Sequence, residues 1–128
     1  MSYYFSTTIQ AEFDEAVERV KDALIVQGFG ILTEIDVKAT MKKKLDKDFR
    51  PYVILGACNP PFAFKALMAE DKIGTMLPCN VIVQEATPGS VEIAAVDPAA
   101  SMQAVENDSL GSIAVQVREK LQTAIDSI

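Results

Sequence analysis

The sequence predicts a single small domain that combines β-strands with α-helices. Its 128 residues fit the usual size of one domain, so we assign residues 1–128 to one unit. With 49% hydrophobic and 23% charged residues, the composition is typical of a globular protein with a buried core. Apolar residues recur with helical spacing in some segments and with a period of two in others. Their order predicts strand, helix, strand, short helix, strand, helix, strand, strand and helix.

The chain opens with a predicted strand and a predicted helix. Aromatic and β-branched residues over Tyr3–Ile9 suit a half-buried strand. The helix is expected from about Glu12 to Gln27, and Gly28 can close it in the left-handed conformation. Its apolar residues recur at helical spacing, at Phe13, Val17, Val20 and Leu24.

A second strand and a basic segment follow. Residues Gly30–Val37 alternate in polarity, which predicts a strand with one wet side. Lys38–Lys47 reads as a short helix in which Met41 and Leu45 are the only apolar anchors. On one face of the strand we expect Ile31, Thr33, Ile35 and Val37.

The segment Tyr52–Glu85 is the centre of the predicted domain. It contains both cysteines of the chain, and each is followed by asparagine. Apolar runs predict strands over Tyr52–Cys58 and Cys79–Ala86. The helix between them is expected to begin at Pro60, with Asn59 as its N-cap.

The last part of the chain should contain a hairpin and a long helix. Thr87–Gly89 is a turn, so Ser90–Val96 should pair with the strand before it. The long helix is expected over Ser109–Ser127, with Asn107 or Asp108 as its cap. We expect the residues 71–78, ahead of the hairpin, to form a loop.

Composition and charge exclude several classes of function. The chain has no histidine, which excludes Ser-His-Asp and Cys-His catalysis and any imidazole metal ligand. A net charge of −6 argues against a dedicated nucleic-acid-binding protein. The segment Lys38–Arg50 is an exception, because its six basic and two acidic residues give +4 and leave −10 for the rest.

No apolar run is long enough to cross a membrane, and the first residues carry no secretory signal pattern. Two cysteines are too few for the disulfide framework of a small secreted protein. We therefore expect a cytoplasmic protein that does not interact with membranes.

Cys58 and Cys79 are the candidate site residues, because one ends a predicted strand and the other begins the next. The thiols can meet if the two strands are antiparallel neighbours, and they lie far apart in a parallel crossover. Two thiolates do not complete a tetrahedral zinc site, although a symmetric dimer could supply four and Cu(I) accepts fewer. A redox pair and two inert core residues are the other interpretations.

The runs LGACNPP (55–61) and LPCNVIVQE (77–85) resemble domain-of-unknown-function family 302, a family of small bacterial and archaeal proteins. The run DVKATMKKKLDKDFRPYVILGACNPPFAFKAL (36–67) also fits, and the resemblance extends from about Ala11 to Val96. It implies an α+β fold similar to the TATA-box-binding protein, with an antiparallel sheet of about five strands against two long helices and shorter ones. It also implies a homodimer. Phe64 departs from the family pattern, in which histidine is common at this position.

We expect a homodimeric, non-enzymatic binding module of unknown ligand. Its small-ligand or metal site would lie at the two Cys-Asn corners, formed by Cys58, Asn59, Cys79 and Asn80. No residue is assigned to catalysis, and no cofactor is specified by the sequence. One alternative is a thiol-dependent redox protein or enzyme that uses Cys58 or Cys79. Another is an adaptor that binds an acidic partner or nucleic acid through Lys38–Arg50.

Overall fold

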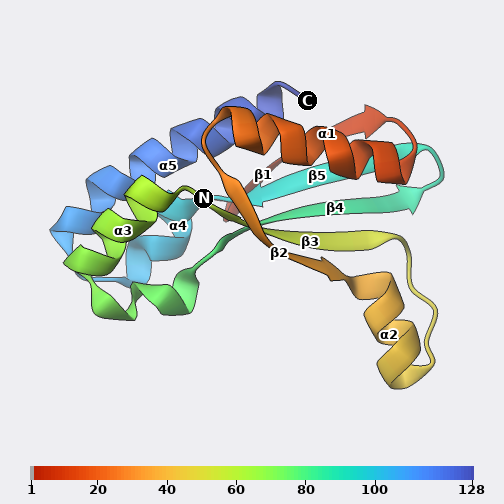
Figure 1. Cartoon of the computed structure of the whole chain (residues 1–128), viewed down its shortest axis with the longest axis horizontal. Helices are drawn as coiled ribbons and strands as arrows, with labels where there is room; N and C mark the ends of the chain where they lie inside the picture. Colours follow the sequence, from red (N-terminus) through yellow and green to blue (C-terminus); the bar gives the residue numbers. More distant parts are fainter. Residues whose placement is uncertain (1) are drawn as a thin grey trace.

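A five-stranded antiparallel sheet forms the centre of the molecule in the computed structural model, which describes residues 2–128 (Figure 1). The strand order is β1-β5-β4-β3-β2, and every neighbouring pair is antiparallel. The strands are β1 (Tyr4–Gln10), β2 (Gly30–Asp36), β3 (Tyr52–Cys58), β4 (Cys79–Thr87) and β5 (Ser90–Val96). The predicted α+β fold class is therefore confirmed.

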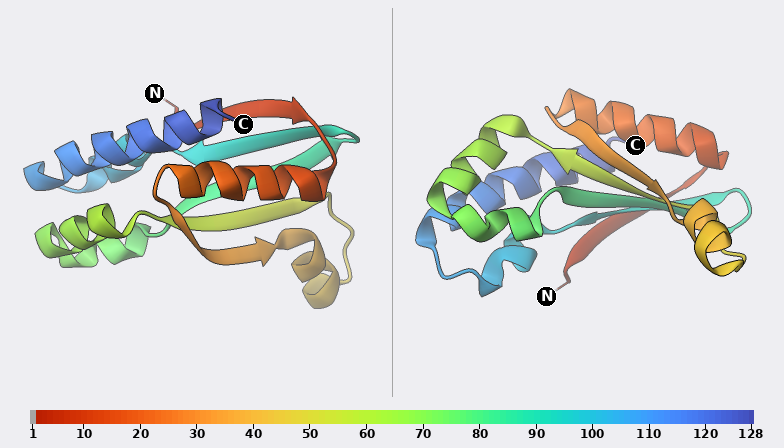
Figure 2. Two further views of the ribbon diagram at one scale, coloured as in Figure 1. Left: turned by 45° about the horizontal axis from the view of Figure 1, so that its top comes forward. Right: turned by 60° about the horizontal axis from the view of Figure 1, so that its bottom comes forward.

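Two long helices cover one face of this sheet, as both views of Figure 2 show. The α-helices are α1 (Phe13–Val26), α2 (Val37–Leu45), α3 (Pro60–Ala69), α4 (Pro98–Ser101) and α5 (Asp108–Asp126), and α1 and α5 are the two that lie on the sheet. Short 3-10 helices are η1 (Asp71–Met76) and η2 (Met102–Ala104). The segment that was expected to be a loop after α3 thus contains η1.

The main core lies between α1, α5 and the covered face of the sheet. Each strand sends alternate side chains into it, because successive residues of a strand point to opposite faces. Burial of each large aliphatic side chain there stabilises the fold by about 1.5–3 kcal/mol. Side chains with no exposed surface include Leu24, Leu55, Val81, Ile93 and Leu121. A second, smaller cluster of Ala66, Ile73 and Leu110 joins α3 and η1 to α5.

No helix formed by residues 2–128 lies on the other face of the sheet (Figures 1 and 2). Strand register places four apolar residues in one row across this open face, namely Ile35, Ile54, Ile82 and Ala94. A hollow of about 410 Å³ lies beside the row, and Tyr3, Tyr4 and Tyr52 line it. These are all the tyrosines of the chain.

An irregularity in β2 changes the side-chain alternation that the sequence predicted. Ile31 pairs with Ala57, but the next paired residue, Thr33, is opposite Gly56, so Leu32 is an extra residue in the strand. A β-bulge of this kind reverses the faces beyond it. Ile31 therefore packs against the main core, while Thr33 and Ile35 lie on the open face. The predicted shared face is wrong for this reason.

Helix α2 projects away from the sheet (Figure 1). Asp36 caps it by accepting a hydrogen bond from the Ala39 N–H. The helix buries none of its residues: Met41 is half-buried, and Leu45 has 63% of its surface exposed. The expectation that Leu45 would anchor the helix is therefore wrong, because no part of the sheet extends far enough to cover it.

The predicted signals are confirmed at the end of α1, at the hairpin turn and at the start of α5. Gly28 closes α1 with a φ of +87°, and Gly89 forms the hairpin turn with a φ of +81°, a region in which glycine avoids a steric cost. Asn107 caps α5 by accepting from the Ser109 N–H at 3.0 Å and donates to the Ala69 carbonyl at 2.8 Å. It thereby fixes the start of α5 to the end of α3.

Candidate cavity at the cysteine corners

A cavity of about 320 Å³ lies at the end of the sheet, where β3 ends and β4 begins. Its wall includes residues of both hydrophobic clusters, such as Val117 of the main core and Ala66 of the smaller one. The cavity is therefore the space that remains between the two clusters. Leu32 and Leu67 belong to the wall and are 64% and 43% exposed, which places the opening between β2 and α3.

The wall is almost entirely apolar. Of the lining residues in the described range 2–128, only Cys58, Asn59 and Cys79 have a polar side chain or a thiol, and none is charged. Such a surface favours apolar molecules and strongly disfavours an ion, because an unpaired charge loses its hydration there.

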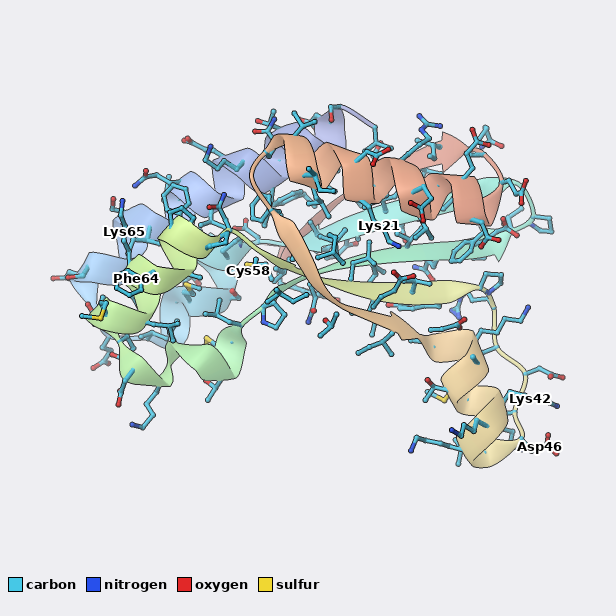
Figure 3. All side chains as sticks on the ribbon, in the orientation of Figure 1. Lys21, Lys42, Asp46, Cys58, Phe64 and Lys65 are labelled. Carbon is cyan, nitrogen blue, oxygen red and sulfur yellow. The ribbon has the colours of Figure 1, made fainter. Side chains whose placement is uncertain are left out.

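The two cysteines lie on neighbouring antiparallel strands, which was the condition for bringing them together. Cys79 is directly opposite Ala57, and Cys58 is the next residue along β3. Both thiols are free; Cys79 is buried, and Cys58 is half-buried. Cys58 lies near the junction between the sheet and α3 (Figure 3).

Burial has a direct consequence for the chemistry of Cys79. It raises the pKa of this thiol to about 11, with a further contribution from the nearby Cys58. The thiolate is the form that attacks electrophiles and binds metals. Cys79 is therefore protonated at neutral pH.

Asn59 connects three elements at this corner. It is buried, and its Nδ2 donates a hydrogen bond to the Gln27 carbonyl at 3.3 Å, at the end of α1. Its side chain makes no capping hydrogen bond to α3, although it holds the N-cap position. Pro60 and Pro61 explain this in part, because neither has an N–H to donate. The predicted N-cap is correct in position and wrong in its hydrogen bond.

The structure brings together three of the four predicted site residues. Asn80 pairs with Gly56, points to the open face and lines the tyrosine hollow instead of the cavity. Sequence reasoning missed Leu32, Gly74 and Ala114, which line the cavity from β2, η1 and α5. No local pattern marks them, because the wall forms only when these distant elements pack together.

The metal site predicted from the sequence depends on Cys58 and Cys79. Among residues 2–128, no group of three or more histidine, cysteine, aspartate or glutamate side chains is placed to hold a metal ion. The two thiols alone leave a zinc site incomplete.

The basic segment Lys38–Arg50 lies at the opposite end of the sheet from the cavity (Figures 1 and 3). Part of its charge is compensated within the segment, because Lys42 lies 2.9 Å from Asp46 and 3.7 Å from Asp48. All three of these side chains are exposed, so the pairs contribute little to stability.

Comparison with known proteins identifies the family of this chain. The chain matches the domain of unknown function DUF302 over residues 5–128. It belongs to the DUF302 family. A solved structure described as an uncharacterized conserved protein DUF302 from Bacillus stearothermophilus is 27% identical, with a TM-score of 0.90 and 98% of each chain covered. No curated protein matches the chain. Across residues 2–128, no helix has both the length and the apolar character needed to span a membrane.

Proposed function

We propose that this DUF302 protein is a non-enzymatic binding module that holds an apolar small molecule in the cavity at the cysteine corners. The observation that carries the proposal is the cavity itself, which is uncharged and apolar except at Cys58, Asn59 and Cys79. Its volume of about 320 Å³ falls at the lower end of the range for small-molecule sites, roughly 300–1,000 Å³.

A small ligand fits this wall better than a metal ion does. No third histidine, cysteine, aspartate or glutamate from residues 2–128 accompanies the two thiols. Burial also argues against a thiol-dependent role for Cys79, because a reactive cysteine needs an accessible thiolate. The thiol-dependent alternative therefore depends on Cys58, which is half-buried.

Gly74 allows a direct test of the site. A Cβ at this position would have only Leu67 Cδ2 nearby, at 3.9 Å, and both residues line the cavity. We expect Gly74→Leu to fill part of the cavity and abolish binding of an apolar probe, 2-methylnaphthalene. The melting temperature of the parent protein should rise with probe concentration, because a ligand that binds only the folded state stabilises it.

Gly111→Leu is the matched control. A Cβ at Gly111 would meet no atom within 4 Å, and Gly111 is not part of the cavity wall. This variant should respond to the probe as the parent does. An equal rise in melting temperature for Gly74→Leu and the parent, or no rise in the parent, would refute the proposed site.

We also propose that the module is a homodimer in which a second copy covers the open face of the sheet. The row of Ile35, Ile54, Ile82 and Ala94 supports this interface, because apolar side chains aligned across strands are stabilised when covered. Sedimentation should show a dimer at micromolar concentration. Ile82→Lys should yield a monomer, while Val115→Lys, a change at an exposed position of α5, which covers the other face of the sheet, should remain dimeric.

A further inference from the structure

Asn59 lines the cavity, and its side chain has a hydrogen-bond acceptor that residues 2–128 leave unused. Its Nδ2 must face the Gln27 carbonyl, because only the amide nitrogen can donate to an oxygen. The orientation of the amide is therefore determined, and Oδ1 is the atom that is left. This Oδ1 has no hydrogen-bond partner among residues 2–128, and it is not fully enclosed by protein atoms.

The free acceptor is notable because Asn59 is 92% buried, with 8% of its surface exposed, and because it lines the cavity. Polar atoms in such positions are normally paired with protein or solvent. The other lining side chains offer only weak hydrogen-bonding groups, namely the thiols of Cys58 and Cys79 and the thioether of Met102. A ligand with one donor could therefore pair with Oδ1 and place the rest of its surface against apolar side chains.

The cavity volume limits the size of this ligand. Its 320 Å³ is about twice the roughly 150 Å³ of an apolar cavity that accommodates benzene. A compact molecule of two fused rings thus fits the space. A carboxylate or ammonium group is excluded, since no lining residue carries a compensating charge.

We propose that the ligand is a neutral, two-ring-sized apolar molecule with a single O–H or N–H donor, which donates to Asn59 Oδ1. Phenol-like and indole-like compounds have this chemistry. The inference rests on the proposed function, because it assigns the ligand class of the same cavity.

The test compares two probes of nearly equal shape, 2-naphthol and 2-methylnaphthalene, in the parent protein and in Asn59→Ala. For each protein, the affinity for 2-naphthol is divided by the affinity for 2-methylnaphthalene. The difference in hydrophobicity between the probes affects both ratios equally, so it cancels when the ratio of the parent is compared with that of Asn59→Ala. One hydrogen bond to a neutral acceptor should increase the preference for 2-naphthol about fivefold in the parent relative to Asn59→Ala.

A second measurement uses the parent alone, because Asn59→Ala also loses the hydrogen bond to Gln27 and could unfold. The NMR resonances of the Asn59 side-chain amide should shift more with 2-naphthol than with 2-methylnaphthalene, because the ring-current shift is common to both probes and only 2-naphthol donates a hydrogen bond.

The outcomes separate the two proposals. If both probes bind, their affinity ratio is the same in parent and variant, and the Asn59 amide responds equally to both, the donor assignment is wrong while the apolar site stands. If neither probe binds to the parent, the proposed function fails and the ligand class fails with it. Tight binding of 2-naphthoate, the anionic analogue, would also overturn the assignment of a neutral ligand.

Discussion

Gly56 is the glycine with the least room for a side chain in the folded protein. It lies in β3, and a Cβ there would lie 2.2 Å from Thr33 Oγ1 and 2.7 Å from Pro78 Cγ. Favourable carbon contacts begin at about 3.5 Å. Rotation of the exposed Thr33 side chain can relieve the first contact, but the ring of Pro78 cannot rotate away. We therefore expect Gly56→Ala to force a backbone shift beside the cavity.

The expected cost follows from two opposing effects. Overpacking of this kind costs about 1–3 kcal/mol. Replacing glycine by alanine also reduces the backbone entropy of the unfolded chain, which stabilises the folded state by about 0.4–1 kcal/mol. Gly56→Ala should therefore lower the free energy of unfolding by about 1–2 kcal/mol, measured by urea titration with circular dichroism.

Gly30→Ala is the control for this prediction. Gly30 is also a strand glycine, but a Cβ there would lie 3.9 Å from the Cys58 carbonyl oxygen, an ordinary contact. Its free energy of unfolding should be unchanged or slightly higher. Adding Thr33→Ala to Gly56→Ala should restore little stability, since the Pro78 contact remains. If Gly56→Ala were as stable as Gly30→Ala, the close packing inferred around Pro78 would be wrong.

Three further predictions concern the cysteines and the start of α4. The pKa of the Cys79 thiol is about 11 in the folded protein and has an ordinary value of 9.0. Between these two pH values the unfolded chain loses the thiol proton first, so the free energy of unfolding should fall by up to about 3 kcal/mol as the pH rises from 9 to 11. Cys79→Ala should flatten this part of the pH–stability profile, and an unchanged profile would contradict the assignment. Thiol titration at pH 7.5 should modify Cys58 before Cys79, with the order read by mass spectrometry; faster reaction at Cys79 would contradict its burial. Asp97→Ala should lower the free energy of unfolding by about 2–3 kcal/mol. The carboxylate of Asp97 accepts hydrogen bonds from Ala99 N–H, Ala100 N–H and Arg118 Nε, and all three would be lost. A loss below about 0.5 kcal/mol in chemical denaturation would refute this role.

The order of elements could be predicted from the sequence because each long element has a strong periodic pattern. The stripe of α1 and the capping Asn107 of α5 are local signals, and the structure places both as expected. The antiparallel pairing of β3 and β4 could not be derived from spacing alone. It was implied by the family resemblance and is confirmed by the register of Ala57 with Cys79.

The errors have a common physical origin in long-range packing. The alternation of polar and apolar residues in β2 gives no sign of the bulge at Leu32. The sequence therefore predicted Ile31 and Ile35 on one face. Leu45 has helical spacing from Met41 but no sheet beneath it. Neither property can be read from the neighbours of these residues in the chain.

Only part of the cavity wall could be predicted from the sequence. Cys58 and Asn59 could be singled out because they end a strand before a Pro-Pro helix start. Their partners in the wall, such as Gly74 and Ala114, come from elements that meet only in three dimensions. The unused acceptor of Asn59 depends on the end of α1, which lies 32 residues earlier in the chain.

The proposed function requires an apolar cavity that can accept an apolar molecule. Crystals of the parent protein under xenon pressure test this directly, because dry apolar cavities bind xenon. We predict xenon density enclosed by Phe62, Ala114 and Cys79, and its absence in crystals of Gly74→Leu. Ordered waters that fill the same space and are not displaced by xenon would contradict the account.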